Sequence, residues 1–416
     1  QGFHASPAAG IAGSATLSRA FEYDALYRLL QATGRESGSF ANSATPWSEG
    51  YYVPDASVSN TRGYTQNYTY DRLGNMLHLH HQASGNTFHR YLNDYSNNAA
   101  AFEMSNLATE ISYGGTTVSY AFDACGNQVS EGTSRHMGWD YGDRMRTYAT
   151  QVGTSEPTVY AHYLYDAGGN RVKKIVRKST GNTEVTIYID GGMEYLYELD
   201  GATKVQEMNE IHVMDGRSRI ARVREVLLSS WTGAAPVAVL YNLEDHLGNA
   251  CFSLTATGGD YSREEYFPFG EMSFRDFGKE RYRFCGKERD GESGLYYYGA
   301  RYYAPWACRF VSIDPLAGEY PFYTPYQYAG NKPVNFIDLD GLELSNSKEG
   351  NSPNPQAKSS ASNSKQQSDH SGKKLFTINI VVLPIDIDKK DADGNGALKK
   401  VASSIEDYYV KNAIYV

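Results

Sequence analysis

Pairs of aromatic residues at alternate positions recur along the chain, and each pair is followed by an aspartate and a short turn-like step. Four clear copies, FEYDALYR, YTYDRLGN, YAFDACGN and YLYDAGGN, occur at 21–28, 68–75, 120–127 and 163–170, and a degenerate copy, NLEDHLGN, occurs at 242–249. Side chains of a β-strand alternate between its two faces, so both aromatic rings of a pair lie on one face. Repetition of such a unit predicts hairpins that stack on one another.

The repeat at 68–75 indicates how one unit forms a strand, a turn and a second strand. Tyr68 and Tyr70 share one strand face. The carboxylate of Asp71 can accept hydrogen bonds from backbone N–H groups just after it, which ends the strand and opens a turn. Gly74 and Asn75 tolerate positive φ, which a tight hairpin requires. We therefore expect each repeat to pair with its neighbours in one extended antiparallel sheet.

The composition favours an all-β fold with many hairpins. The 416 residues include 35 Tyr, 16 Phe, 4 Trp and 40 Gly. Tyrosine suits strands that are apolar along the ring and hydrated at the hydroxyl, and glycine beside Asn or Asp indicates tight turns. The net charge of -9, with no basic stripe, argues against nucleic acid as a partner.

Other features exclude several further classes. The four cysteines show no metal-ligand spacing and are expected to be small, mostly buried residues: Cys125, Cys251, Cys285 and Cys308. No apolar run reaches the roughly 18 residues that a membrane-spanning helix needs. The chain starts at Gln1 without a signal peptide, so we interpret it as a fragment of a longer product.

The octets resemble the YD repeats of RHS proteins and of the C-type subunits of insecticidal toxin complexes. The stretch FEYDALYRLLQATGRE at 21–36 is especially similar to the latter group. Residues 241–342 resemble the RHS repeat-associated core, through the motifs GLYYYGARYY, RFVSIDP and YQYAGNKPVNFIDLDG. These motifs are long and specific, and the resemblance covers roughly residues 15–342.

We expect the chain to divide into five parts. The resemblance implies a spiralling β-shell at 15–240, a core that plugs the shell at 241–342 and a payload after 342. The chain itself suggests an unstructured start at 1–14, a disordered linker at 343–374 and a truncated or vestigial payload at 375–416. In the family the shell closes into a hollow cocoon that holds a C-terminal toxin. A fragment with fewer than the full set of repeats is expected to leave an open edge and to need more shell.

The resemblance also implies that the core acts once as an aspartic protease on its own chain. The matching residues are Arg301 in GARYY, Asp314 in SIDP and Asp338 in FIDLDG, and the expected scissile bond is Leu342–Glu343. Two carboxylates that share one proton can supply a general base for water and a general acid for the carbonyl oxygen. Arg301 would orient a carboxylate.

A purely structural role for these residues remains open. Asp314 precedes Pro315, and Asp338 and Asp340 flank a loop, so each aspartate can simply cap a turn. The family usually has Asp-Pro before the final glycine, whereas this chain has Asp338-Leu339-Asp340-Gly341, and the interval from Asp314 to Asp338 is longer by one residue. Asp340 is a less favoured stand-in for Asp338.

The tail after residue 342 changes composition sharply. Residues 343–374 are rich in Ser, Asn, Gln, Lys and Pro, which predicts a disordered linker. Residues 375–387 predict one or two strands, and 397–416 predict the start of a helix, giving a small α+β tail. DADGNG at 391–396 resembles half of a calcium loop, but Ala402 stands at the twelfth position, so a polar turn is favoured.

A histidine cluster, HLHH, is a further candidate for metal binding. His78 and His80 share one strand face, but no acidic or cysteine partner is at a suitable spacing. We therefore interpret His78, His80 and His81 as solvent-side strand residues, and we expect neither a metal nor a cofactor.

Two functions from different classes are consistent with these observations. The first is a secreted or cell-surface bacterial toxin module that encapsulates and delivers a payload, with self-cleavage after Leu342. Its expected partners are its own C-terminal payload, a B-type shell subunit or upstream shell segment, and an immunity protein, without nucleic acid and without a membrane span. The alternative is a cell-surface adhesion or carbohydrate-binding protein without proteolytic activity.

Overall fold

A computed structural model describes residues 18–41, 45–48, 60–92, 106–113, 115–189, 192–228, 236–275, 280–342 and 344–346. All of them except the turn Ala256–Gly258 belong to one compact unit. The expected start at 1–14 lies outside the described residues. So do the linker and the payload, apart from one short strand at Leu344–Asn346.

Twenty strands form one antiparallel sheet in which each strand pairs with the next one along the chain. This confirms the expected all-β class and the stacking of hairpins. The strands are β1 (Ala20–Tyr23), β2 (Leu29–Ser37), β3 (Thr61–Tyr70), β4 (Met76–Ala83), β5 (Asn86–Leu92), β6 (Glu110–Tyr113), β7 (Thr116–Phe122), β8 (Gln128–Glu131), β9 (Arg135–Trp139), β10 (Met145–Thr150), β11 (Val159–Tyr165), β12 (Arg171–Lys178), β13 (Asn182–Ile189), β14 (Met193–Asp200), β15 (Thr203–Asp215), β16 (Ser218–Val226), β17 (Val239–Glu244), β18 (Ala250–Thr255), β19 (Asp260–Tyr266) and β20 (Met272–Arg275).

Residues 280–342, which we call the inner segment, leave this sheet and form small elements of their own. Four short strands pair as a second sheet: β21 (Glu288–Arg289), β22 (Tyr296–Tyr297), β23 (Tyr302–Ala304) and β24 (Arg309–Phe310). The remaining elements are a hairpin of β25 (Phe336–Asp338) with β26 (Leu344–Asn346) and three 3-10 turns, η4 (Phe284–Gly286), η5 (Pro305–Ala307) and η6 (Ala329–Asn331). None of the described helices is long and apolar enough to cross a membrane.

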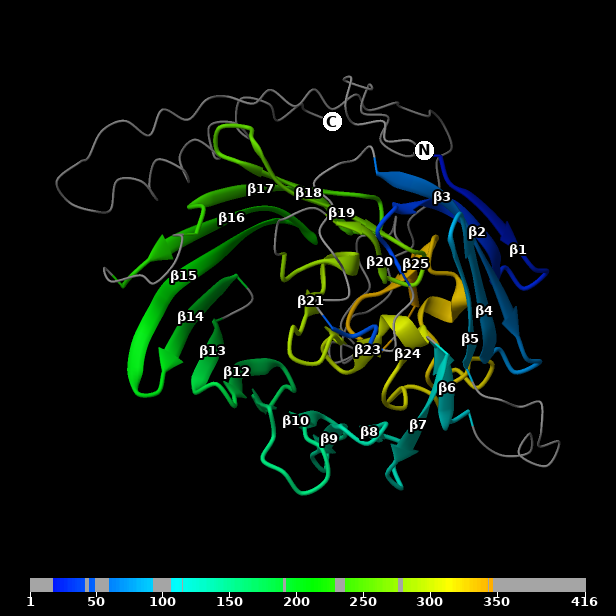
Figure 1. Ribbon diagram of the computed structural model, residues 1–416, viewed down its shortest axis with the longest axis horizontal. Coiled ribbons are helices and arrows are strands. Elements are labelled where there is room, and N and C mark those ends of the chain that lie inside the picture. Colours follow the sequence, from blue (N-terminus) through cyan, green and yellow to red (C-terminus); the bar gives the residue numbers. More distant parts are fainter. Residues whose placement is uncertain are drawn as a thin grey trace, which may run out of the picture. The chain divides into compact units, whose positions relative to one another are not determined.

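The large sheet curls around the inner segment, so that its last strands come back beside its first strands (Figure 1). An ion pair joins the two ends. Arg35 on β2 contacts Glu265 on β19, with 2.5 Å between Nη2 and Oε1. β1 pairs only with β2 and β20 only with β19 among the described strands, so the curled sheet is not closed by hydrogen bonds.

An aspartate organises the turn in each repeat, as the sequence predicted. Asp71 Oδ1 accepts the N–H groups of Gly74 and Asn75 at 2.7 and 2.8 Å, and its other oxygen accepts the side-chain amide of Asn75. The same Asp-to-Asn pattern recurs in the turns that begin at Asp123, Asp166 and Asp245. Gly74 has a φ of +100°, which only glycine adopts easily.

A β-bulge accompanies every copy of the repeat, and the sequence did not predict it. The register shifts at the second aromatic position of each clear copy, at Tyr23, Tyr70, Phe122 and Tyr165, and at the matching Glu244 of the degenerate copy. A bulge increases the local right-handed twist of a strand pair. Bulges at regular intervals along one face therefore help the sheet to curl.

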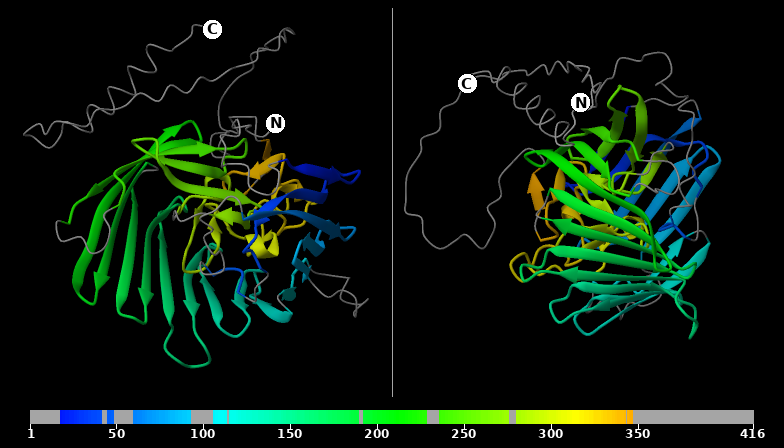
Figure 2. Two further views of the ribbon diagram at one scale, coloured as in Figure 1. Left: turned by 45° about the horizontal axis from the view of Figure 1, so that its top comes forward. Right: turned by 90° about the vertical axis from the view of Figure 1, so that its left-hand side faces the viewer.

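The inner segment lies inside the curled sheet (Figure 2), and the first aromatic residue of several repeats, such as Tyr68 and Tyr163, is buried on that side. Tyr163 is fully buried with its ring centroid 5.7 Å from that of Tyr302, and its hydroxyl donates to Glu292. Tyr68 is also buried and lies 5.2 Å from Phe269 in the turn before β20. Ring contacts of this kind add to the hydrophobic free energy gained by burial.

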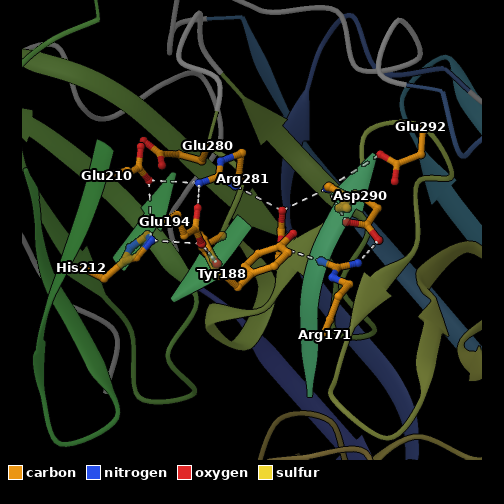
Figure 3. A network of polar contacts seen from close by, with 12 residues as sticks. Arg171, Tyr188, Glu194, Glu210, His212, Glu280, Arg281, Asp290 and Glu292 are labelled. Carbon is orange, nitrogen blue, oxygen red and sulfur yellow. Dashed lines mark hydrogen bonds and ion pairs between the residues drawn. The ribbon is translucent and has the colours of Figure 1, made fainter. Parts of the chain in front are cut away.

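Buried ion pairs tie the inner segment to strands β12–β15 (Figure 3). Arg171 on β12 contacts both Glu288 and Asp290 at 2.6 Å, and Lys174 contacts the same two carboxylates at 3.1 and 2.7 Å. Tyr188 donates a hydrogen bond to Glu288. The nearby cations hold the pKa of Glu288 well below its usual range, although burial alone would raise it.

His81 is not a solvent-side residue, which corrects the sequence-based interpretation. It lies on the inward face of β4, it is fully buried, and its Nε2 is 2.9 Å from Glu36 Oε2. His78 and His80 are on the opposite face and remain partly accessible. The alternation of strand faces separates neighbours such as His80 and His81, because adjacent side chains point in opposite directions.

The buried turn of the second repeat gives a test of the aspartate contacts. We expect Asp71→Ala to lower the free energy of unfolding by about 1–3 kcal/mol, because three donors lose their acceptor in a buried site. Urea denaturation followed by tryptophan fluorescence measures the change. Asp166→Ala, in an exposed turn of the same kind, is the matched control and should have a smaller effect.

The contacts of Arg171 give a test of how the inner segment is held. Arg171→Met should lower the free energy of unfolding by about 3–5 kcal/mol, because it leaves buried carboxylates short of a partner. The same urea titration measures it. Lys178→Met removes the exposed pair with Glu184 at the end of β12 and should cost at most about 1 kcal/mol. Equal effects of the two substitutions would contradict the assignment.

Candidate active site

The three residues that the family resemblance singled out lie on different turns of the inner segment. Arg301 directly precedes β23, Asp314 follows β24, and Asp338 is the last residue of β25. The loop after β25 comes close to Arg301 because residue 341 is glycine: its φ is +81°, and an added Cβ would lie 2.8 Å from the Arg301 nitrogen.

The guanidinium of Arg301 brings the two carboxylates together. Its Nη2 is 2.8 Å from Asp314 Oδ2 and 3.0 Å from Asp338 Oδ2. Because both oxygens contact one nitrogen, they are no farther apart than the sum of these distances. The guanidinium also lies over the Phe310 ring, with 3.7 Å from Cζ to the ring centroid. The structure therefore places all three predicted residues at one site.

Two of the same residues hold the backbone just before the predicted cut. Asp338 Oδ1 accepts the N–H of Gly341 at 2.7 Å, and Arg301 Nε donates to the carbonyl of Gly341 at 2.5 Å. Asp314 Oδ1 accepts the N–H of Leu316 at 2.8 Å. Both aspartates thus also cap turns, as the structural interpretation expected, so capping and chemistry are not exclusive.

Burial shifts the pKa values of both carboxyl groups upward. Asp338 is buried, which raises its pKa to about 6, and the opposing effect of Arg301 is smaller. Asp314 is more accessible, and burial raises its pKa as well, again against Arg301. A carboxyl group with a pKa near neutrality can hold a proton at physiological pH and can donate it.

A cavity of about 210 Å³ opens at this site. Arg301, Asp314, Asp338 and Leu342 line it together with the aromatic residues Tyr320, Phe322 and Tyr323. Leu342 carries the carbonyl group of the predicted scissile bond. The candidate acid, the candidate base and the residue to be cut thus line one cavity.

Asp340 has a different role from Asp338. Its Oδ1 accepts the N–H of Leu342 at 3.2 Å, and its backbone carbonyl accepts the N–H of Ala300 at 2.8 Å. Lys287 Nζ donates to the neighbouring carbonyl of Leu339. These contacts fix the loop, whereas Glu343 on the far side of the predicted cut lies outside the described residues.

One buried cluster on the sheet has residue types that bind cations. Potential ligand atoms of Glu194, Glu210 and His212 lie within 4.8 Å of one another. Arg281 contacts both glutamates (Figure 3). Arg224 Nε is 2.6 Å from Glu210 Oε2. The guanidinium groups already balance this negative charge, so the cluster is a set of ion pairs and not a metal site.

The cysteines do not form a nucleophilic site among the described residues. Cys308 is buried and Cys251 and Cys285 are partly buried, whereas Cys125 is exposed and departs from the expectation of mostly buried cysteines. Burial raises the pKa of Cys285 to about 12, which disfavours the reactive thiolate.

Comparisons with known proteins place these features in context. No family model matches the chain. The chain is 28% identical to the toxin subunit YenC1 of Yersinia entomophaga over 77% of its own length and 33% of that subunit, and 28% identical to the toxin protein Tse5 of Pseudomonas aeruginosa over 54% and 18%. It therefore spans about a third of the length of the Yersinia subunit.

The fold is also found in solved structures. A crystal structure of TcdB2–TccC3 without the hypervariable C-terminal region matches with a TM-score of 0.66 and 25% identity, over 78% of this chain and 15% of that one. The repeated octets with their aspartate-capped turns, the open twenty-stranded sheet and these similarities agree with one another. The chain is therefore similar to toxin proteins of the RHS, or YD-repeat, type and has the β-shell fold seen in TcdB2–TccC3.

Proposed function

We propose that this chain is part of a bacterial toxin shell and that it cuts its own backbone between Leu342 and Glu343 to free the segment that follows. One observation carries the proposal. Arg301 contacts two carboxylates with raised pKa values, Asp314 and Asp338, in a cavity that Leu342 also lines.

The different environments of the two carboxyl groups suggest their roles. Asp338 is the more buried group and has the pKa near 6, so it is the candidate general acid that protonates the carbonyl oxygen. Asp314 is the more accessible group on the cavity wall, so it is the candidate base for a water molecule. Arg301 holds both carboxylates and also polarises the adjacent Gly341 carbonyl.

Tethering would make a single turnover efficient without a binding site for a separate substrate. β25 and β26 form a hairpin in which Asp338 lies opposite Leu344, and the predicted cut is in the connecting loop. Holding reactants in place converts a bimolecular step into an intramolecular one, with effective concentrations of about 10⁵ M or more in favourable geometries.

The departures from the family motif are compatible with this role. The usual proline would stiffen the loop after the acidic residue, and Leu339 stands in its place here. Hydrogen bonds from Lys287 to the Leu339 carbonyl and from Ala300 to the Asp340 carbonyl hold the same loop. Backbone contacts would therefore replace the ring constraint.

The open sheet supports a shell that is completed by other chain segments. The outer edges of β1 and β20 have no further strand partner among the described residues, and free edges invite pairing. TccC3 is found in complexes with TcdB2, so a B-type subunit or an upstream shell segment is a candidate partner. The segment after Leu342 would be the payload. An immunity protein would protect the producing cell from it, and the toxin would be secreted.

Substitution of the site residues tests self-cleavage. The full chain should yield one fragment that ends at Leu342 and one that begins at Glu343, seen on a denaturing gel and identified by mass spectrometry. Asp314→Asn and Asp338→Asn should each leave the chain intact, because each removes one carboxylate of the pair. Asp340→Asn is the matched control and should still be cut. An intact unsubstituted chain would exclude the proposal.

The pKa of Asp338 predicts how the rate of cleavage depends on pH. Asp338 donates only when protonated, so the rate should fall as pH rises through about 6, on the order of tenfold between pH 5.5 and pH 7.5. Chain kept in urea and refolded at each pH, then sampled over time on a gel, gives the rate. A rate that increases steadily toward alkaline pH would show that Asp338 is not the acid.

A further inference from the structure

We propose that His78, His80 and His89 form a binding site for a divalent late transition-metal ion, such as Zn²⁺, on the outer face of the shell. This site is on strands β4 and β5, on the side of the sheet that faces away from the inner segment. It is separate from the self-processing chemistry and does not depend on it.

The register of the hairpin brings the three histidines together. His78 and His80 are two residues apart on β4 and therefore share one face. His89 on β5 lies directly opposite His80, and Tyr91 lies opposite His78. The burial pattern places all three imidazoles on the accessible face, while His81 and Phe88 of the same pairing face inward. The arrangement of two ligands on one strand and a third across from them suits a small cation.

The imidazole of His89 lies close to both of the others, whereas the ring centroids of His78 and His80 are 6.1 Å apart. Nε2 of His78 and Nδ1 of His89 are 2.9 Å apart. The ring centroids of His80 and His89 are 4.1 Å apart with the planes nearly parallel, at 4°, and those of His78 and His89 are 5.1 Å apart. Zinc–nitrogen bonds are about 2.0–2.1 Å long, so two ligand nitrogens of one ion must lie only a few ångströms apart.

Modest side-chain rotation converts this stack into a ligand set. Coordination requires the ring nitrogens to point at one centre, whereas the metal-free rings lie face to face. The rings are at the surface of the sheet, so turning them about χ1 and χ2 needs no repacking of the core. Three protein nitrogens would leave a fourth tetrahedral position for water or for a donor from a partner.

The outward neighbours of the three histidines add no positive charge that would repel a cation. The outward residues that flank the histidines are uncharged, namely Asn67, Thr69, Gln82, Thr87 and Tyr91. A metal ion binds the unprotonated nitrogen of a neutral imidazole, so zinc binding at this site should weaken at acidic pH.

The choice of metal follows from the ligand type. Imidazole nitrogen suits zinc, copper, nickel and cobalt, whereas calcium and magnesium prefer oxygen ligands. The site therefore selects a transition metal over the abundant hard cations. Its position on the outer wall would let the ion join the shell to another protein through the open position.

Titration of the full, tag-free chain with ZnCl₂ in competition with a chromogenic chelator tests the proposal. One saturable zinc site per chain is expected. His78→Ala, His80→Ala and His89→Ala should each weaken zinc binding at least about tenfold, since loss of a ligand exceeds the effect of losing a supporting contact. Co²⁺ absorption should report a four-coordinate nitrogen-rich site in the unsubstituted chain and lose intensity in the three variants.

His162 on β11 provides the matched control. It also faces outward, but burial lowers its pKa and the charges of Arg146 and Arg177 lower it further, so these surroundings disfavour a cation. His162→Ala should leave zinc binding unchanged. Circular dichroism and urea unfolding should be the same for all four variants, because each replaces a side chain on the outer face. Absence of saturable binding, or equal affinity in the three β4–β5 variants and the unsubstituted chain, would overturn the site.

Discussion

This architecture depends on one kind of hydrogen bond, in which an aspartate carboxylate at the end of a strand accepts backbone N–H groups of the following turn. Asp71, Asp123, Asp166 and Asp245 each do so, and an asparagine four residues later completes the turn. The turn sends the chain back beside itself, and a bulge just before it adds twist. Repeated along the chain, these two local features produce a wall that curls instead of a flat sheet.

The wall and the inner segment stabilise each other through very different contacts. Tyrosine rings such as Tyr163 supply buried area, whereas Arg171 and Lys174 supply charge for Glu288 and Asp290. Buried ion pairs add little net stability compared with apolar packing, but they penalise any other arrangement strongly. The polar contacts therefore fix where the inner segment lies, and with it the position of Arg301 and its two aspartates.

The sequence predicted the strands and turns because their determinants are local. An aromatic pair, an aspartate and a Gly-Asn step occur within eight residues, so no long-range information is needed. The candidate site was predicted only from the family motifs that contain Arg301, Asp314 and Asp338. Arg301 contacts Asp338 across 37 residues of sequence, and no local sequence pattern indicates such a contact. His89 was missed for the same reason: it lies opposite His80 only once the hairpin is paired, whereas the inward direction of His81 follows from simple alternation.

The turns of the wall also contact the loops that support the candidate site, and this implies an order of folding. The side chain of Asn331 donates to the Gly74 carbonyl, the hydroxyl of Tyr326 donates to the Gly126 carbonyl, and Gln128 donates its N–H to Val311. The loops that carry Asp314 and Asp338 thus rest on hairpins made much earlier in synthesis. A chain with an incomplete wall would lack this support, so the proposed cleavage would have to follow assembly of the wall.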